Sequence, residues 1–173
     1  NPDMAAGGMP EVDMNTPQWT LMLYLAADNG SASATLNLLD ELAGAAPANG
    51  VRVVAQIDGR TSGTRRLILQ NGRWVEVAHL GELDMATQEN VAAFLEWASG
   101  FETERRALVV LDSGTTIRGI SGDENGGAGR VMAPQGLASA LREGLDGRRR
   151  ELIVLDGSFT ANLETAYESR THR

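Results

Sequence analysis

Two segments of the sequence place hydroxyl and carboxylate groups directly after short apolar runs. The run 107–111 (ALVVL) is followed by Asp-Ser-Gly, with Ser113 in the middle, and the run 152–155 (LIVL) is followed by Asp156, a glycine and Ser158. The glycine in each segment permits a tight turn and close approach of a ligand. A serine hydroxyl can act as a nucleophile, but it needs a general base within hydrogen-bond reach. The question for both segments is therefore whether the chain supplies that base.

The sequence contains two imidazoles that could serve as a base, His79 and His172. His79 belongs to a predicted β-hairpin, where an ordinary strand residue is the simpler interpretation, and His172 is the second-last residue. The more frequent role of Asp and Ser at the end of a strand is to cap the turn or helix that follows. Spacing alone therefore predicts that these two turns could form a site, but it does not assign a general base to either serine.

The composition excludes several other kinds of site. The chain has 173 residues, no Cys, and a formal net charge of −8, and all of its basic side chains are Arg. Disulfides, thiolate metal sites and Lys-dependent chemistry are thus excluded. The negative charge argues against a nucleic-acid surface, and no apolar run approaches the ~18 residues that a membrane span needs.

The periodicity predicts an α/β fold with a mostly parallel sheet, helices on both faces and a β-hairpin insertion. A loose arm at 1–17 precedes a single domain at 18–173. The Asn71-Gly72 pair predicts the hairpin, and helix 84–100 has Val91, Phe94, Leu95 and Ala98 on one face. The predicted buried strands are 19–26, 51–57, 107–111 and 152–155, and the predicted hairpin strands are 65–70 and 73–79. Three further helices are predicted. The first follows residue 31 and has an apolar stripe of Leu36, Leu38, Leu39 and Leu42, the second spans 134–145, and the third runs from about 160 to the end.

Ligand sites in open α/β sheets form at the carboxyl ends of the strands. In this chain those ends carry Asp28, Asp58, the segment 112–114 and Asp156 with Ser158. We therefore expect a functional site at this edge of the sheet. The acidic, glycine-rich segment 121–127 lies in a predicted loop from 115 to 133, and it lacks the alternating Asp pattern of an EF-hand.

Five segments, in order, resemble the clostripain-like (C11) cysteine peptidases, which have a caspase-like fold. They span nearly the whole chain from Trp19 to Arg170: WTLMLYLAADN from Trp19, LGELDMATQENVAAFLEWA from Leu80, GISGDE from Gly119, APQGLASAL from Ala133, and LIVLDGSFTANLETAYE from Leu152. The last of these resembles the family's strand and helix around its catalytic Cys.

The resemblance assigns roles to residues of this chain. The His-Gly pair of the family corresponds to Ser113 and Gly114, and its nucleophilic Cys corresponds to Ser158. Asp156 corresponds to a wall of the pocket for a basic substrate side chain, since active relatives prefer Arg. A thiolate assisted by an imidazole is absent, so we expect no peptidase turnover. The resemblance leaves open whether the serines arose by natural loss or by deliberate substitution.

The resemblance carries expectations about partners and cofactors too. A caspase-like domain continues beyond its Cys strand, so residues 18–173 are expected to be its N-terminal, large-subunit-like part, completed by a C-terminal fragment or a second chain. The ending at Arg173 fits processing by an Arg-specific protease. Calcium stays open as a cofactor because some relatives depend on it, and no other cofactor is assigned.

The remaining expectations concern the ligand, the compartment and competing functions. The expected ligand is an Arg-containing peptide or protein. The compartment is undetermined, although the resemblance favours a secreted or periplasmic location. Two other functions compete with the peptidase scaffold: a natural pseudopeptidase that binds peptides or proteins, and an unrelated flavodoxin-like or receiver-type signalling domain.

Overall fold

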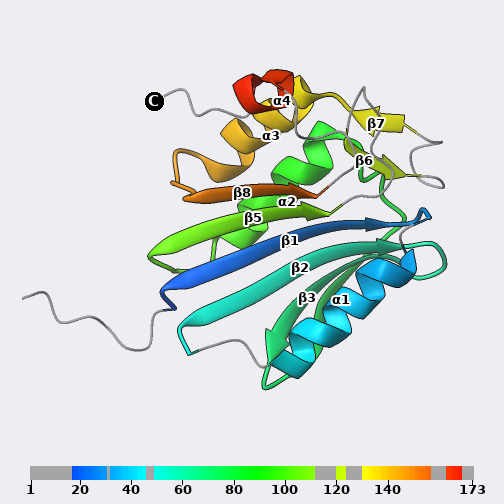
Figure 1. Ribbon diagram of the computed structural model, residues 1–173, viewed down its shortest axis with the longest axis vertical. Helices are drawn as coiled ribbons and strands as arrows, with labels where there is room; N and C mark the ends of the chain where they lie inside the picture. The colour runs from blue at the N-terminus through cyan, green and yellow to red at the C-terminus, as the bar shows by residue number, and fades with distance from the viewer. Residues whose placement is uncertain are drawn as a thin grey trace, which may run out of the picture.

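The computed structural model describes residues 17–30, 32–45, 49–111, 120–123, 130–156 and 163–168 (Figure 1). Its elements, in chain order, are β1 (Trp19–Ala27), α1 (Ala32–Ala45), β2 (Val51–Gly59), β3 (Gly63–Gln70), β4 (Arg73–Gly81), α2 (Gln88–Ser99), β5 (Arg105–Leu111), β6 (Ile120–Asp123), β7 (Arg130–Met132), α3 (Pro134–Leu145), β8 (Leu152–Asp156) and α4 (Leu163–Glu168). The predicted arm at 1–17 lies, except for Pro17, outside the described residues.

Six strands form one sheet in the order β4-β3-β2-β1-β5-β8, and β6 and β7 form a separate two-stranded sheet. β1 pairs in parallel with β2 and β5, and β5 pairs in parallel with β8. β3 and β4 are added antiparallel at one edge. The mostly parallel sheet with a hairpin insertion is therefore confirmed.

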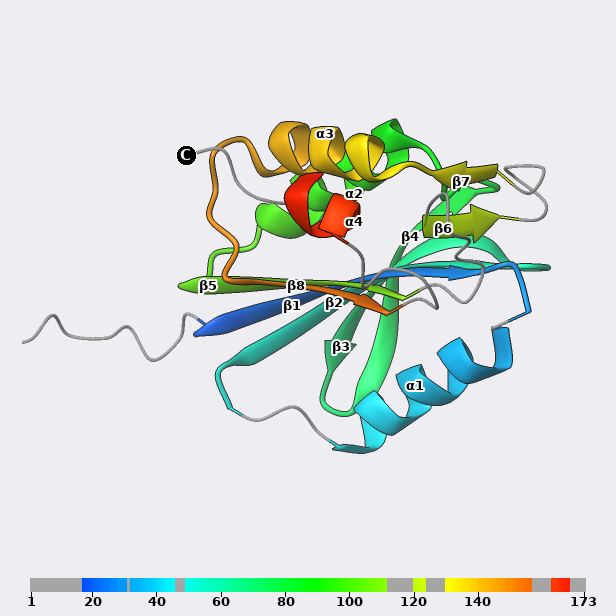
Figure 2. The same ribbon diagram turned by 45° about the horizontal axis from the view of Figure 1, so that its top comes forward.

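The central strand β1 is apolar on both faces, as its uninterrupted sequence predicts for a parallel sheet covered on both sides. Met22 and Tyr24 belong to one hydrophobic cluster, and Leu23 and Leu25 to the other. Helices α2 and α3 cover the first face, and α1 covers the second (Figures 1 and 2). The sheet is thus the middle layer of three.

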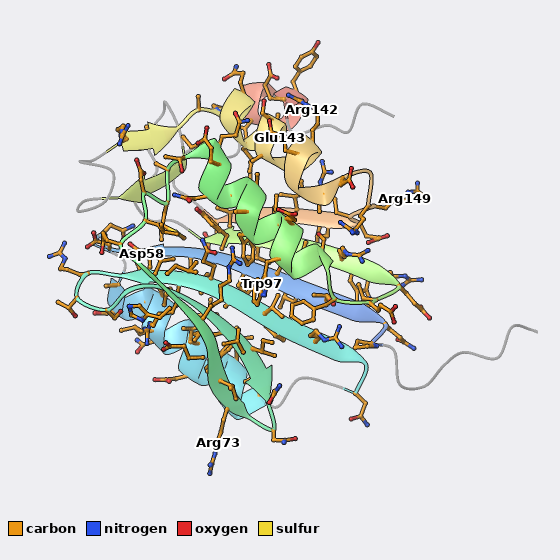
Figure 3. The ribbon with its side chains drawn as sticks, turned by 180° about the vertical axis from the view of Figure 1, so that it is seen from behind. Asp58, Arg73, Trp97, Arg142, Glu143 and Arg149 are labelled. Atoms are coloured by element: carbon orange, nitrogen blue, oxygen red, sulfur yellow. The ribbon has the colours of Figure 1, made fainter. Side chains whose placement is uncertain are left out.

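Helix α2 presents the predicted apolar stripe to the sheet, and all four of its members are buried. Arg66 of β3 reinforces this packing, because its guanidinium lies over the ring of Trp97 and donates a hydrogen bond to Ala93 O at 3.0 Å. Burial lowers the pKa of Arg66, and the charge of Glu96 partly opposes that shift. Figure 3 shows Trp97 on the face of α2 that lies against the strands.

The hairpin turn has the backbone that its sequence predicts. Asn71 and Gly72 have φ angles of 50° and 72°, both in the left-handed region that a type I′ turn requires. Its two strands are each longer than the sequence indicates, because the pairing of β3 and β4 continues to Thr64 and Gly81 through two register shifts.

Other expectations need correction. Helix α2 begins at Gln88 instead of residue 84, because the Thr87 hydroxyl caps it and the preceding residues form a turn. Part of the predicted loop at 115–133 forms the β6–β7 hairpin. Leu36 is half exposed, so the apolar face of α1 is narrower than its leucines suggest.

Strand β8 is the largest departure from the predicted buried strand. Its residues alternate between partly buried and exposed, with Leu152 and Val154 on the exposed side. The reason is its place at the edge of the sheet, beyond the reach of α1 (Figure 2).

None of the helices in the described part of the chain is long and apolar enough to cross a membrane.

Candidate functional site

The carboxyl ends of β5 and β8 lie side by side. Leu111, the last residue of β5, is paired in register with Asp156, the last residue of β8. Asp156 is exposed, so its carboxylate is accessible to a ligand at this edge. Ser113, Gly114 and Ser158 lie outside the described residues, and their predicted roles stay predictions. What the structure establishes is that the segments containing them leave the sheet from adjacent strands.

Three carboxylates gather at the carboxyl ends of β1, β2 and β4. Asp28 directly follows β1, Asp58 lies near the end of β2, and Glu82 follows β4. One carboxylate oxygen of each lies within 4.8 Å of the others. Asp28 and Asp58 are almost fully buried, whereas Glu82 is exposed. The sequence predicts the first two as strand ends, but Glu82 joins them only through the fold of the hairpin.

Each of the two buried aspartates has a donor beside one of its carboxylate oxygens. The Thr64 hydroxyl of β3 donates to Asp58 Oδ1 at 2.7 Å, and Arg60 Nε lies 3.4 Å from Asp28 Oδ1. A buried carboxylate needs such partners because its desolvation is otherwise unfavourable by several kcal/mol. Neither Thr64 nor Arg60 was predicted as part of a site. Their proximity to strand ends in a hairpin would be the only sequence signal for them.

Oxygen ligands of this kind suit Ca²⁺ or Mg²⁺ chemically. The calcium expectation came from the family resemblance, and the acidic segment considered for it, 121–127, lacks the EF-hand pattern. Residues 121–123 of that segment belong to β6, and 124–127 lie outside the described residues. Calcium therefore stays a prediction, and the Asp28–Asp58–Glu82 group is the acidic group that the described structure brings together. Figure 3 shows Asp58 at the edge of the sheet where the parallel strands end.

The position of His79 agrees with its interpretation as an ordinary strand residue. It lies in β4, at the opposite edge of the sheet from β8. Its Nδ1 lies 3.5 Å from Glu76 Oε1, and more than half of its side chain is exposed. His79 is therefore separated from the β5–β8 strand ends by the width of the sheet, and His172 lies outside the described residues.

Solved structures share this architecture. A secreted C11 cysteine protease from Bacteroides thetaiotaomicron, in complex with an irreversible peptide inhibitor, aligns with a TM-score of 0.70 and 18% identity over 88% of this chain. A second structure of a secreted C11 protease from that organism, named iotapain, aligns with a TM-score of 0.71 and 16% identity over 89% of the chain. The chain has the caspase-like fold of the C11 cysteine proteases. An inactive zymogen C11 protease from Parabacteroides distasonis aligns similarly, with a TM-score of 0.68 and 17% identity over 89% of the chain.

The chain spans about half the length of these C11 proteases, covering 46%, 50% and 46% of them. At this level of identity the likeness concerns the fold. No protein-family model matches the chain, and no curated protein matches it in sequence.

The hydrogen bond from Thr64 to Asp58 gives a test of the buried acidic group. We expect Thr64→Val to lower the free energy of unfolding by about 1.5–3 kcal/mol, because a buried carboxylate loses a donor. Thr20→Val is the matched control: Thr20 is equally buried, and its hydroxyl has no hydrogen-bond partner among the described residues. Urea unfolding of both variants measures the difference. Equal effects of the two substitutions would contradict the assignment.

Proposed function

We propose that this chain is the N-terminal part of a clostripain-like (C11) peptidase domain that binds an Arg-containing peptide at the carboxyl edge of the sheet and does not cleave it. The observation that carries the proposal is the fold shared with C11 cysteine proteases, together with the pairing of Leu111 and Asp156. This pairing makes the segments with Ser113 and Ser158 leave adjacent strands, as a two-residue catalytic site requires.

The absence of turnover follows from side-chain chemistry. A cysteine peptidase uses a thiolate that an imidazole helps to form near neutral pH. A serine hydroxyl is a much weaker acid, and a serine in the His position cannot accept its proton. Ser113 and Ser158 therefore leave a scaffold with a place for substrate but without its nucleophile and base.

The exposed carboxylate of Asp156 supports the binding part of the proposal. A guanidinium forms short, charge-assisted hydrogen bonds with such a group. The acidic residues Asp28, Asp58 and Glu82 lie at the ends of strands on the same side of the sheet, so their field favours a cationic ligand there. A natural pseudopeptidase that acts as a binding module would use the same surface.

The signalling-domain alternative is less well supported. The four parallel strands have the order β2-β1-β5-β8, which flavodoxin-like domains share, so the parallel part alone does not separate the two. The antiparallel β3–β4 hairpin at the edge, and the fold match along 88% of the chain, favour the C11 scaffold.

The exposed face of β8 supports a further polypeptide as partner. Leu152 and Val154 are 51% and 39% exposed, and β8 is the last strand of the sheet. An apolar edge strand is a surface that proteins normally cover. The matched C11 proteases are about twice as long as this chain, so we propose that a C-terminal fragment or a second chain packs here. A secreted or periplasmic location, which two of these proteases support by being secreted, belongs to the same proposal.

Replacement of Asp156 tests the binding site. We expect the chain to bind an Arg-containing peptide, and Asp156→Asn to weaken that binding by about tenfold or more, because a charge-assisted hydrogen bond is lost. Asp146→Asn is the control, since Asp146 is an exposed aspartate before the amino end of β8. Calorimetry with the Arg peptide and its citrulline analogue measures both. Unchanged affinity in Asp156→Asn would contradict the site.

Restoration of the dyad tests the scaffold. We expect Ser113→His together with Ser158→Cys, with the C-terminal polypeptide present, to create cleavage of a fluorogenic peptide after Arg. Each single variant should stay inactive, because a nucleophile and a base act as a unit. A folded double variant that binds the peptide without cleaving it would favour the binding module over a peptidase that lost its dyad.

Replacement of Leu152 tests the partner surface. We expect Leu152→Lys to abolish association with the C-terminal polypeptide while changing the free energy of unfolding by less than about 0.5 kcal/mol, because the side chain is exposed. Leu36→Lys is the control, being a leucine of 50% exposure on α1. Size-exclusion chromatography measures association. Normal assembly of Leu152→Lys would contradict this surface.

A further inference from the structure

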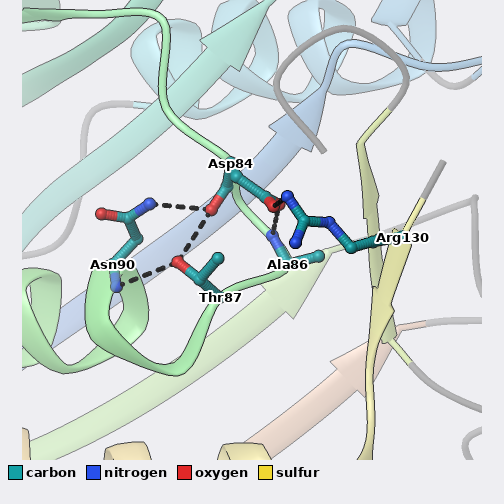
Figure 4. Close-up of polar contacts among 5 residues, drawn as sticks. All are labelled: Asp84, Ala86, Thr87, Asn90 and Arg130. Carbon is teal, nitrogen blue, oxygen red and sulfur yellow. Dashed lines mark hydrogen bonds and ion pairs between the residues drawn. The ribbon is translucent and has the colours of Figure 1, made fainter. Parts of the chain in front are cut away.

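The carboxylate of Asp84 joins two parts of the structure that are far apart in sequence (Figure 4). Its Oδ1 accepts a hydrogen bond from the N–H of Ala86 at 2.9 Å, within the turn before α2. Its Oδ2 lies 2.9 Å from Nη2 of Arg130, the first residue of β7. The second contact is an ion pair between the turn and the β6–β7 hairpin.

Asp84 is held in place independently of Arg130. Its backbone carbonyl accepts hydrogen bonds from the Thr87 hydroxyl at 3.1 Å and from Asn90 Nδ2 at 2.8 Å. The Thr87 hydroxyl in turn accepts from the N–H of Asn90 and caps α2. The carboxylate is therefore presented to Arg130 by a turn that has its own hydrogen bonds.

The turn is also fixed to the centre of the sheet. Met85, the next residue, is fully buried. Its carbonyl accepts a hydrogen bond from the hydroxyl of Tyr24 in β1 at 3.0 Å, and its sulfur lies 3.7 Å from Nε2 of Gln56 in β2. Asp84 is thus attached to a rigid part of the molecule.

Arg130 belongs to the two-stranded β6–β7 sheet, which is separate from the six-stranded sheet. The β6–β7 hairpin has two register pairs, Ile120 with Met132 and Asp123 with Arg130. Met132 is buried at the α3 end, so Arg130 lies at the other end of β7. Figures 1 and 2 show this hairpin near the carboxyl ends of β1 and β5, on the side of the sheet that α2 and α3 cover. It is joined to β5 by the segment 112–119, which contains Ser113.

We propose that the Asp84–Arg130 ion pair is a tether that holds the β6–β7 hairpin against the amino end of α2. The Asp84 side chain is 11% exposed and that of Arg130 is 70% exposed. Asp84 is therefore largely buried, whereas Arg130 is exposed to solvent, so salt can screen the ion pair.

Hydrogen exchange separates this role from a general effect on stability. Asp84→Asn keeps an oxygen for the N–H of Ala86 and removes only the charge, whereas Ala93→Gly lowers the helix propensity of α2 at an exposed position and keeps the ion pair. We expect Asp84→Asn to raise amide exchange in 120–132 by about fivefold, the upper range for a partly exposed ion pair, and to leave the α2 amides unchanged. Ala93→Gly should show the opposite pattern.

Arg130→Gln provides a second route to the same result, because Arg130 is exposed and its replacement does not disturb the core. It should reproduce Asp84→Asn, and the double variant should add nothing further. Salt should speed exchange of the wild-type hairpin and leave that of Asp84→Asn unchanged. Hairpin exchange that is equal in wild type and Asp84→Asn, or additive effects of the two substitutions, would overturn the tether.

Discussion

The structure depends on the need to bury both faces of β1. This strand has no polar side to turn toward water, so it requires a neighbour on each edge and a helical layer on each face. β2 and β5 supply the edges, and α1 with α2 supplies the layers. Parallel pairing with those neighbours then brings their carboxyl ends to one side of the sheet. The position of the candidate site is thus a consequence of how the core is closed.

Burial of carboxylates at that edge is electrostatically unfavourable, and hydrogen-bond donors close by offset this cost. Asp58 and Asp84 are both buried or nearly so, and each has one oxygen held by a short-range donor, the Thr64 hydroxyl or the Ala86 N–H. Donors fixed by a hairpin or a helix cap stabilise a carboxylate without a long, flexible side chain. The edge can therefore be acidic and ordered at once, which suits a site for a cationic ligand.

The two edges of the sheet are formed differently, one by an antiparallel hairpin and the other by a parallel strand. The β3–β4 hairpin extends one edge, with the ring of Trp74 donating to Leu39 O of α1. The other edge ends at β8, whose Leu152 and Val154 lie on a face that no described helix covers. The C11 proteases of the same fold are about twice as long. Leu152 and Val154 are apolar surface that added polypeptide could bury, as are the exposed Val75 and Val77 of β4 at the other edge.

Sequence by itself determined the features that arise from local patterns. The apolar runs predicted the four parallel strands, Asn71-Gly72 predicted the hairpin, and the stripe from Val91 to Ala98 predicted the buried side of α2. Each depends on periodicity or on a backbone angle that few residues adopt. The ordered motifs from Trp19 to Arg170 gave the caspase-like fold in advance. Only the tertiary structure decided that β8 is an edge strand, that Glu82 joins Asp28 and Asp58, and that Asp84 meets Arg130. These contacts join residues far apart in sequence, and no local pattern encodes which surfaces the folded sheet brings together.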